Sequence, residues 1–128
     1  MSNNPLVSIV AVSYNQEGYI KDSLMSLLCQ DYSPLQIIVS DDHSTDSTFQ
    51  ILFDIAKQYD GPHELIIHRN EFNLGIGGNR NKAIELAKGE LLVTADGDDI
   101  SVPNRVSTLV EYWKSQSPRP LLITTDAI

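Results

Sequence analysis

Short apolar runs alternate along this chain with segments of helical periodicity, an arrangement that few folds accommodate. Leu6 to Val12 is almost continuously apolar and rich in β-branched residues, as expected for a strand buried on both faces of a parallel sheet. From Ile20 the apolar residues recur at i, i+4, i+7 and i+8, and Pro34 closes the segment. This spacing predicts an amphipathic helix after the first strand.

The same two patterns then repeat to the end of the chain. Further strands are predicted over Leu35–Val39, Leu65–His68, Glu90–Ala95 and Leu121–Thr125. Helices are predicted with the face Phe49, Leu52, Phe53 and Ala56, then from a loop with Gly75, Gly77 and Gly78 through Lys88, and from Val102 to Trp113 with Pro103 in the first turn. The alternation indicates an α/β class with a doubly wound, mainly parallel, Rossmann-like sheet, which breaks off after about the fifth strand.

The composition describes an ordinary globular domain and narrows the choice of partners. The chain has 128 residues, of which 41% are hydrophobic and 20% charged, so residues 1–128 can bury one core. A net charge of −8 argues against a nucleic-acid partner, because such proteins carry basic patches. No apolar stretch approaches the roughly 18 residues of a membrane span. The single cysteine, Cys29, is interpreted as a buried thiol in a reducing compartment, which indicates a cytoplasmic location.

Polar residues gather directly after three of the predicted strands. Tyr14 and Asn15 follow the first strand, and Asp41 and Asp42 follow the second. The segment Asp96-Gly97-Asp98-Asp99 follows the fourth. Ligands of open α/β sheets bind outside the carboxyl ends of the strands. We therefore expect these groups to meet at one edge of the sheet and to form a binding site there.

The carboxylates of Asp96, Asp98 and Asp99 are the candidate metal ligands. An aspartate x aspartate pair at a strand end can direct oxygen ligands at one hard cation, Mg²⁺ or Mn²⁺, which would bridge to diphosphate oxygens. A solvated turn is the alternative interpretation. Three carboxylates within four residues repel one another unless a cation lies nearby, so we favour the metal site.

Several other polar residues admit a functional and a structural interpretation. Arg80 follows a glycine-containing stretch, where a helix start and a guanidinium could receive a phosphate, but an exposed helical arginine fits as well. Tyr14 suits either stacking on a nucleobase or packing at a strand end. Asp46 is better placed to cap the second helix than to bind a ligand. The three histidines lack metal-ligand spacing, and no chemistry is assigned to them.

Four segments in this order resemble the pattern of glycosyltransferase family 2, inverting sugar-nucleotide transferases with the A-type fold. The segments are Val7–Asn15, Ile38–Asp46, Asn73–Gly75 with Gly78–Asn81, and Asp96–Asp99 ahead of Pro103. Together they cover almost the whole chain. Two places depart from the family pattern: His43 stands where a glycine is common, and Gly78-Asn79 stands where small residues such as alanine are common.

The resemblance implies nucleotide-binding roles for the residues after the first two strands. It implies that Tyr14, with Asn15 beside it, packs against the nucleoside base, and that Asp42 accepts a hydrogen bond from that base, usually uracil. Asp41 would lie beside this contact. Arg80 would approach the pyrophosphate.

The resemblance also implies an activity and a set of partners. Asp96 and Asp98 would form the aspartate x aspartate element, which reaches the ribose and the metal, with Asp99 in support. The reaction would move a sugar from a nucleoside-diphosphate sugar, with uridine favoured, to a hydroxyl of a carbohydrate or lipid-linked acceptor. Mn²⁺ or Mg²⁺ would assist, and the anomeric configuration would invert.

The resemblance leaves the acceptor side open. The catalytic base of the family lies well beyond the aspartate x aspartate element, in a region this chain does not reach, and Asp126 is too near the end for that role. We therefore expect residues 1–128 to be a donor-binding domain without the acceptor-binding half. A non-catalytic nucleotide-sugar-binding module is the alternative. A homo-oligomer, and a location at the inner membrane surface for a longer protein, stay open.

Two other α/β families fit less well. A response-regulator receiver carries its acidic pair after the first strand, where this chain has Ser13-Tyr14-Asn15. A dinucleotide-binding dehydrogenase needs a third glycine where Arg80 stands, and polar residues separate the third strand from Gly75.

Overall fold

A four-stranded parallel sheet forms the centre of the fold. The computed structural model describes residues 4–116, in which strands and helices alternate strictly. The strands are β1 (Val7–Ser13), β2 (Leu35–Asp41), β3 (Glu64–Arg69) and β4 (Leu91–Asp96), in the spatial order β3-β2-β1-β4. All three neighbouring pairs are parallel, which confirms the predicted class. The expected strand Leu121–Thr125 lies outside the described residues.

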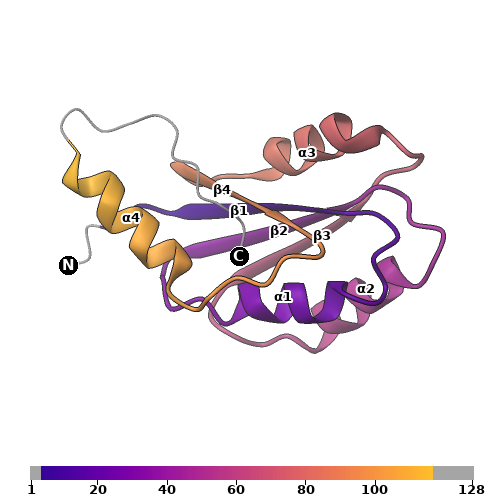
Figure 1. The fold of residues 1–128 in the computed structure, drawn as a ribbon, viewed down its shortest axis with the longest axis horizontal. Helices are drawn as coiled ribbons and strands as arrows, with labels where there is room; N and C mark the ends of the chain where they lie inside the picture. The colour runs from indigo at the N-terminus through magenta and orange to yellow at the C-terminus, as the bar shows by residue number, and fades with distance from the viewer. Residues whose placement is uncertain (1–3, 117–128) are drawn as a thin grey trace.

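Helices cover both faces of this sheet (Figure 1). On one face lie α1 (Ile20–Leu28) and α2 (Thr48–Gln58), and on the opposite face lies α3 (Gly75–Leu86). The last helix, α4 (Arg105–Ser115), joins the core on the side of α1 and α2. Between residues 4 and 116, no helix has the length and apolar character needed to cross a bilayer.

The two central strands are buried on both faces. Ile9 of β1 belongs to the large core cluster with α1, α2 and α4, whereas its neighbour Val10 belongs to the smaller cluster under α3. Both side chains are fully buried. Each such side chain contributes about 1.5–3 kcal/mol to folding through the apolar area that it removes from water. This two-sided burial explains why the sequence of β1 is apolar at successive positions instead of alternating.

Strand β2 is longer than predicted and includes two polar residues at its end. The predicted strand ends at Val39, but Ser40 and Asp41 also belong to β2. Because β1 and β3 pair with β2 on either side, backbone bonding continues to Asp41. This extra length carries the Asp41 side chain into the protein, where it is fully buried.

The bounds of α3 and α4 also correct the predictions. The stretch Gly75–Gly78, expected as a loop, forms the first turn of α3, and the helix ends at Leu86 before reaching Lys88. Local propensity disfavours glycine in a helix, so tertiary contacts must hold this turn. Helix α4 begins at Arg105, and Pro103 precedes it instead of lying in its first turn.

Two side chains expected inside the protein lie on its surface. Phe53 is 44% exposed, and α2 buries Leu52 instead. The Phe53 ring lies 6.3 Å from the Phe49 ring, centroid to centroid, and the Lys57 ammonium lies 5.3 Å from the Phe53 centroid. Cys29 is exposed and not buried, because it follows α1 one turn after Met25, on the solvent side of that helix. The argument for a reducing compartment from a buried thiol therefore loses its basis.

Asp46 holds the start of α2, as predicted, although Ser47 occupies the N-cap position. Its Oδ1 accepts hydrogen bonds from the backbone N–H of Thr48 (2.9 Å) and from the Thr48 hydroxyl (2.6 Å). Its Oδ2 accepts one from the Glu17 N–H (3.3 Å). Partial burial favours a higher pKa for Asp46, but these hydrogen bonds outweigh it and lower the pKa below the ordinary value.

We expect Asp46→Ala to lower the free energy of unfolding by about 1 kcal/mol at neutral pH, because α2 loses its capping carboxylate. The folded-state pKa lies below the unfolded-state pKa, so this stabilisation is complete above the unfolded-state pKa. It is lost as the pH falls through the folded-state pKa. Urea unfolding at a series of pH values measures the effect, with Asp60→Ala, an exposed aspartate beyond α2, as the control. A difference that does not change with pH would contradict this role.

Candidate functional site

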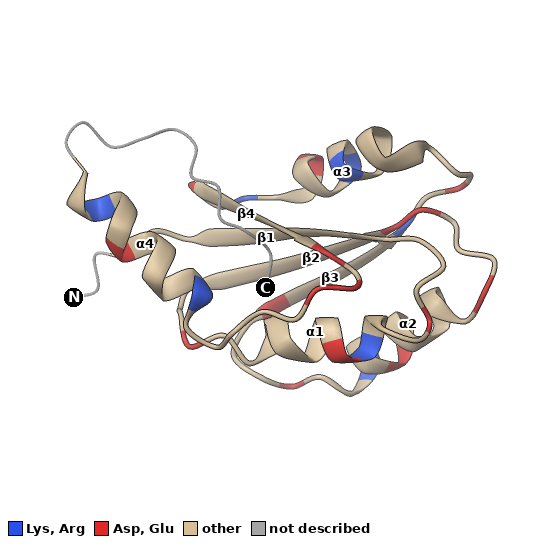
Figure 2. Ribbon diagram, in the orientation of Figure 1, with Lys and Arg blue, Asp and Glu red and all other residues tan. Residues whose placement is uncertain are grey.

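The strand register brings the polar strand ends to one edge of the sheet. Val12 of β1 is paired with Asp96 of β4, and Ser13 is paired with Asp41 of β2. Figure 2 shows the acidic segments that end β2 and follow β4 at the same end of the sheet. The prediction that these groups meet at one edge is confirmed.

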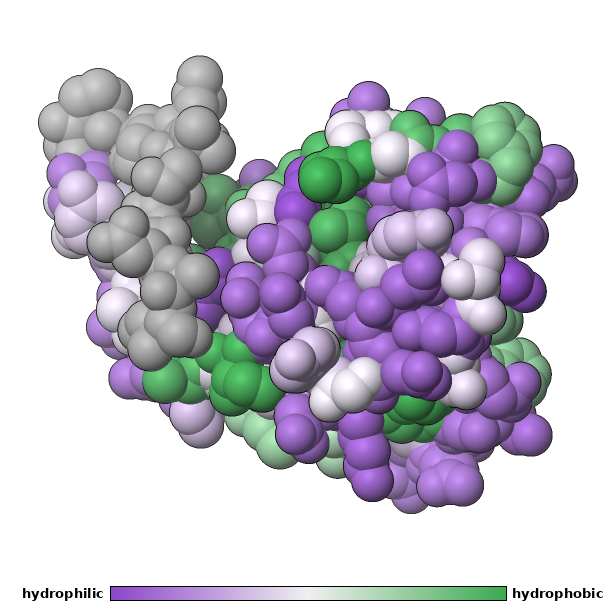
Figure 3. Space-filling model, turned by 45° about the vertical axis from the view of Figure 1, so that its right-hand side comes forward, coloured by the Kyte–Doolittle hydropathy of each residue, from purple (hydrophilic) through white to green (hydrophobic). Residues whose placement is uncertain are grey.

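A cavity of about 530 Å³ opens at this edge, within the size range of small-molecule sites. It lies between the ends of β1 and β4 and the first turns of α3. Five predicted site residues line it: Tyr14, Asp42, Arg80, Asp96 and Asp98. The surface on this side of the molecule is mainly hydrophilic (Figure 3). Three predicted residues do not line the cavity: Asn15, Asp41 and Asp99.

Tyr14 lies beside the cavity with an exposed ring. Its side chain is 46% exposed, and its backbone N–H donates to Gln16 Oε1 at 3.3 Å. Gly97, in the turn after β4, packs against the same Gln16 side chain, and a β-carbon at this position would also lie 3.1 Å from Ile20 Cδ1. Glycine thus allows the Asp96–Asp98 turn to approach the loop after β1.

Asp42 anchors the start of α3. Its Oδ1 accepts hydrogen bonds from the Leu74 N–H (2.8 Å) and from Asn70 Nδ2 (2.9 Å), and its Oδ2 accepts one from the Gly75 N–H (2.9 Å). Gly75 has a φ of 84°, a conformation that glycine adopts without strain. A carboxylate offers about four acceptor positions, so about one is left for a ligand in the cavity.

Asp41 is bonded inside the protein instead. Its Oδ1 accepts from the hydroxyls of Ser13 (2.8 Å) and Ser44 (2.6 Å), and its Oδ2 accepts from the Ser44 N–H (2.9 Å). Asn15 connects the loop after β1 to the loop after β2, because its Oδ1 accepts a hydrogen bond from the Thr45 N–H at 2.8 Å. Its φ of 50° is one that asparagine tolerates better than most residues. Direct ligand contacts by Asp41 and Asn15 stay predictions that this bonding does not favour.

Arg80 and Asp96 form an ion pair at the cavity. Arg80 Nη2 lies 2.8 Å from Asp96 Oδ1, and its Nη1 donates to the Val10 carbonyl at 3.4 Å. The side chains are 25% and 53% exposed, so solvent screens the pair and it contributes at most about 1 kcal/mol to stability. The pair holds a guanidinium and a carboxylate next to each other where a charged ligand would enter.

The predicted three-carboxylate cluster is not assembled. Among residues 4–116, no group of three or more His, Cys, Asp or Glu side chains is arranged to hold a metal ion. Asp96 is paired with Arg80, and Asp99 lies off the cavity, near enough to Arg105 for their charges to interact. Burial, followed by the charges of Asp96 and Asp98, raises the pKa of Asp99.

Two of the predicted metal ligands line the cavity. Asp96 ends β4, and Asp98 lies inside the turn that the Asp99 N–H closes by donating to the Asp96 carbonyl at 3.1 Å. Mg²⁺ and similar cations are commonly bound by one or two carboxylates together with substrate phosphates and water. The two aspartates could therefore hold such an ion once a diphosphate supplies the remaining oxygens.

Some residues of the site carried no prediction. Gln16, Asn73, Ile76 and Asn79 also line the cavity. The only sequence signal at Asn79 was that a polar residue stands where small residues are common in the family pattern.

The histidines have structural contacts, in line with their lack of ligand spacing. His43 Nδ1 and His63 Nε2 lie 3.0 Å from the backbone carbonyls of Asn70 and Gln30. His68 Nε2 lies 2.9 Å from Asn70 Oδ1.

Comparison with known proteins identifies the family. Residues 8–119 match the sequence model of glycosyl transferase family 2, and the chain belongs to this family. The putative colanic acid biosynthesis glycosyl transferase WcaA of Escherichia coli is 34% identical over 100% of this chain and 45% of its own length. The chain spans 34 to 45% of the length of the first curated relatives that it matches.

Solved structures agree with this assignment. TarS of S. aureus in complex with UDP has a TM-score of 0.76 and 30% identity, over 87% of this chain and 32% of that one. Mannosyltransferase PcManGT of Pyrobaculum calidifontis, in complex with GDP-Man and Mn²⁺, has a TM-score of 0.77 and 25% identity, over 90% and 34%. The A-type glycosyltransferase fold implied by the resemblance is confirmed.

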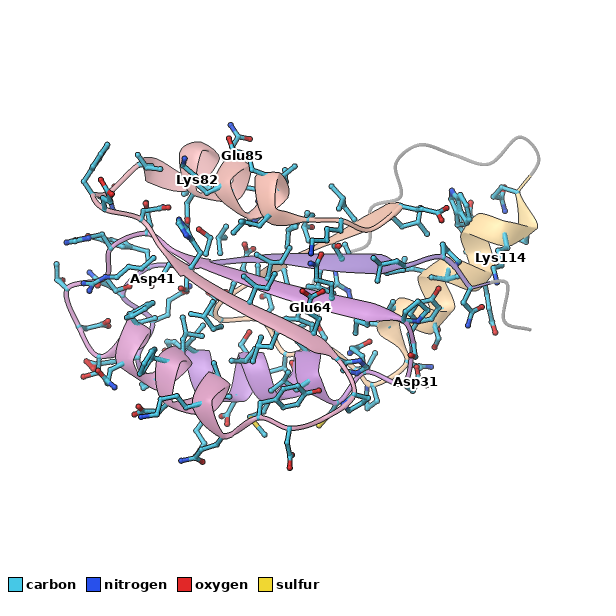
Figure 4. All side chains as sticks on the ribbon, turned by 180° about the vertical axis from the view of Figure 1, so that it is seen from behind. Asp31, Asp41, Glu64, Lys82, Glu85 and Lys114 are labelled. Atoms are coloured by element: carbon cyan, nitrogen blue, oxygen red, sulfur yellow. The ribbon has the colours of Figure 1, made fainter. Side chains whose placement is uncertain are left out.

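We expect Asp41→Ala to lower the free energy of unfolding by about 3 kcal/mol, because it leaves the Ser44 N–H and two hydroxyls without their acceptor. Asp41→Asn should cost only about 1 kcal/mol, since the amide oxygen can accept from Ser44 and the hydroxyls can rotate to accept. Denaturant unfolding measures both. Asp31→Ala, at the other end of the sheet (Figure 4), is the control. Equal losses for the two Asp41 variants would argue against this arrangement.

Proposed function

We propose that the protein transfers a sugar from a nucleoside-diphosphate sugar, with uridine diphosphate as the favoured leaving group, to an acceptor hydroxyl. Mn²⁺ or Mg²⁺ assists, and the anomeric configuration inverts. One observation carries this proposal: a single cavity is lined by an exposed tyrosine, a buried aspartate, an arginine and two aspartates from an aspartate x aspartate turn. The UDP bound by TarS, and the GDP-Man and Mn²⁺ bound by PcManGT, support a donor of this class.

The nucleoside end of the donor would bind near the end of β1. The Tyr14 ring offers an aromatic face for a base, and such stacking is worth about 1–3 kcal/mol. Asp42 has about one acceptor position left after its three bonds to the protein, which suits an N–H of a uracil ring. Those three bonds hold the carboxylate still, so little conformational freedom is lost when the base binds.

The diphosphate would bind between α3 and the turn after β4. Arg80 supplies a positive charge with a planar fork of N–H donors, which suits phosphate oxygens. Asp96 and Asp98 are negative and would repel a diphosphate by themselves. They would hold the divalent cation, which supplies positive charge to the leaving diphosphate when bound. Arg80 would then turn from Asp96 toward the phosphate.

Transfer is a single displacement at the anomeric carbon. The acceptor oxygen forms a bond to this carbon as the bond to the diphosphate oxygen breaks, and the electron pair leaves with the nucleotide. Stabilising the developing charge on the diphosphate lowers the barrier. The acceptor hydroxyl loses its proton to a base, which we expect outside residues 4–116. We propose a carbohydrate or lipid-linked acceptor, consistent with the GlcNAc-diphosphoundecaprenol in the name of the Escherichia coli glucosyltransferase WfaP. A location in the cytoplasm or at the inner membrane surface, and any homo-oligomer, stay predictions.

Metal-dependent binding and transfer test this proposal. We expect uridine diphosphate with Mn²⁺ to raise the melting temperature, because a ligand bound only by the folded state stabilises it, and nucleotide alone to have little effect.

Asp98→Asn should weaken metal-dependent nucleotide binding and transfer while leaving the fold intact. Asp22→Asn, an exposed aspartate on α1, is the matched control. Equal stabilisation with and without Mn²⁺ would show that the Asp96–Asp98 turn does not bind the metal. Tight donor binding without acceptor-dependent glycoside formation would favour a binding module instead.

Tyr14→Ala should weaken uridine diphosphate binding by about 1–3 kcal/mol if the ring stacks on the base. Binding of inorganic diphosphate with Mn²⁺ should not change, because it has no base to stack. Calorimetric titration of both ligands measures the difference. Tyr19→Ala is the control, since Tyr19 is 64% exposed and does not line the cavity. A parallel loss for both ligands would make Tyr14 structural.

A further inference from the structure

Asn79 is a buried polar residue on α3, directly before Arg80 in the chain. Its side chain is 2% exposed. Nδ2 donates to the Ser40 carbonyl at 2.9 Å and to the Ser13 carbonyl at 3.5 Å, at the ends of β2 and β1. Oδ1 accepts from Asn70 Nδ2 at 2.9 Å. Because carbonyl oxygens only accept, the nitrogen of Asn79 must face the strands, so its amide has one orientation.

Asn70 continues this set of bonds from Asn79 to Asp42. Asn70 is also buried, and its Nδ2 donates to Asp42 Oδ1 at 2.9 Å as well as to Asn79. One N–H of the Asn70 amide group therefore bonds to Asn79, and the other bonds to Asp42. Its Oδ1 faces His68 Nε2, and its backbone N–H donates to the Asp41 carbonyl. Asn79 thus helps to orient the amide that supports the Asp42 carboxylate.

The first turns of α3 need such support. They contain Gly75, Gly77 and Gly78, and glycine is one of the poorest helix formers. The residue at the N-cap position, Leu74, makes no side-chain capping bond. The two buried residues of α3 are Asn79 and Ala83, one turn apart, while Lys82 and Glu85 lie on the outer side of the helix (Figure 4). Asn79 therefore makes the buried polar contact between α3 and the sheet, and the partly exposed Arg80 beside it makes the others, to Val10 and Asp96.

We propose that Asn79 is a positioning residue for the donor: by bonding α3 to the ends of β1 and β2, it sets the place from which Arg80 reaches the diphosphate. This inference rests on the proposed function of the cavity. Asn79 acts through Arg80, whose own contacts are the Val10 carbonyl and Asp96. An alanine at this position could make none of the three bonds of the Asn79 side chain.

A double-mutant cycle tests this coupling. The affinity of the protein for uridine diphosphate with Mn²⁺ is measured by calorimetry for the wild type, Asn79→Ala, Arg80→Ala and the double variant. We expect Asn79→Ala to weaken binding about tenfold, the size of effect expected when buried polar groups lose their partners. The double variant should bind about as weakly as Arg80→Ala, because nothing is left to position. Additive losses, or unchanged affinity in Asn79→Ala, would overturn the proposal.

A destabilised variant away from the cavity separates positioning from a general loss of stability. Leu109→Ala removes an apolar side chain of α4 that packs against the core, so it should lower stability and leave affinity unchanged. If Leu109→Ala weakens nucleotide binding as Asn79→Ala does, Asn79 has no specific role. Should Asn79→Ala not fold, Asn79→Ser replaces it in the same cycle, with the same criterion. A wild type that does not bind the nucleotide would contradict the proposed function itself, whereas a binding wild type with additive losses contradicts only this inference.

Discussion

The parallel pairing of β1 with β2 on one side and β4 on the other is the constraint on which the site depends. The register sets Ser13 beside Asp41 and Val12 beside Asp96, so polar groups that are distant in sequence become neighbours. Shifting this register would be costly, because a slip of one residue would exchange side chains packed in the core under α1 and α2 with side chains packed under α3. The cavity therefore rests on a well-packed edge of the sheet, although most of the residues that line it are polar.

Asp41 and Asp42 are adjacent in the sequence, but Asp41 bonds inside the protein and Asp42 lines the cavity. Successive residues at a strand end point to opposite sides, so Asp41 and Asp42 enter different surroundings. Asp41 accepts hydrogen bonds from the Ser13 hydroxyl at the end of β1 and from the hydroxyl and N–H of Ser44 in the loop after β2. Asp42 instead meets the start of α3 and lines the cavity. Both carboxylates are buried, and in both the hydrogen bonds offset the cost of removing a charge from water.

The charges at the cavity explain why an anionic donor would need a cation. Asp96 and Asp98 provide negative charge, and the positive charge of Arg80 is already shared with Asp96. A diphosphate entering alone would meet net repulsion, whereas a divalent cation between the aspartates and the phosphates would reverse it. The ion pair is half exposed, so exchanging its partners costs little. Asp99 does not line the cavity, so the charge of the cavity depends on Asp96 and Asp98 more directly than on Asp99.

Local patterns in the sequence determined the strands, the helices and the candidates Tyr14, Asp42, Arg80, Asp96 and Asp98, because hydrophobic periodicity and motif spacing are properties of neighbouring residues. Those patterns could not show that the Asp41 carboxylate is bonded inside the protein, place Cys29 or Phe53 at the surface, or show that glycines begin α3. The bonds that decide the role of Asn79 join it to Ser40 and Ser13, 39 and 66 residues away. Only the strand order β3-β2-β1-β4 brings such partners together, since burial and hydrogen bonding depend on neighbours in space and not in sequence.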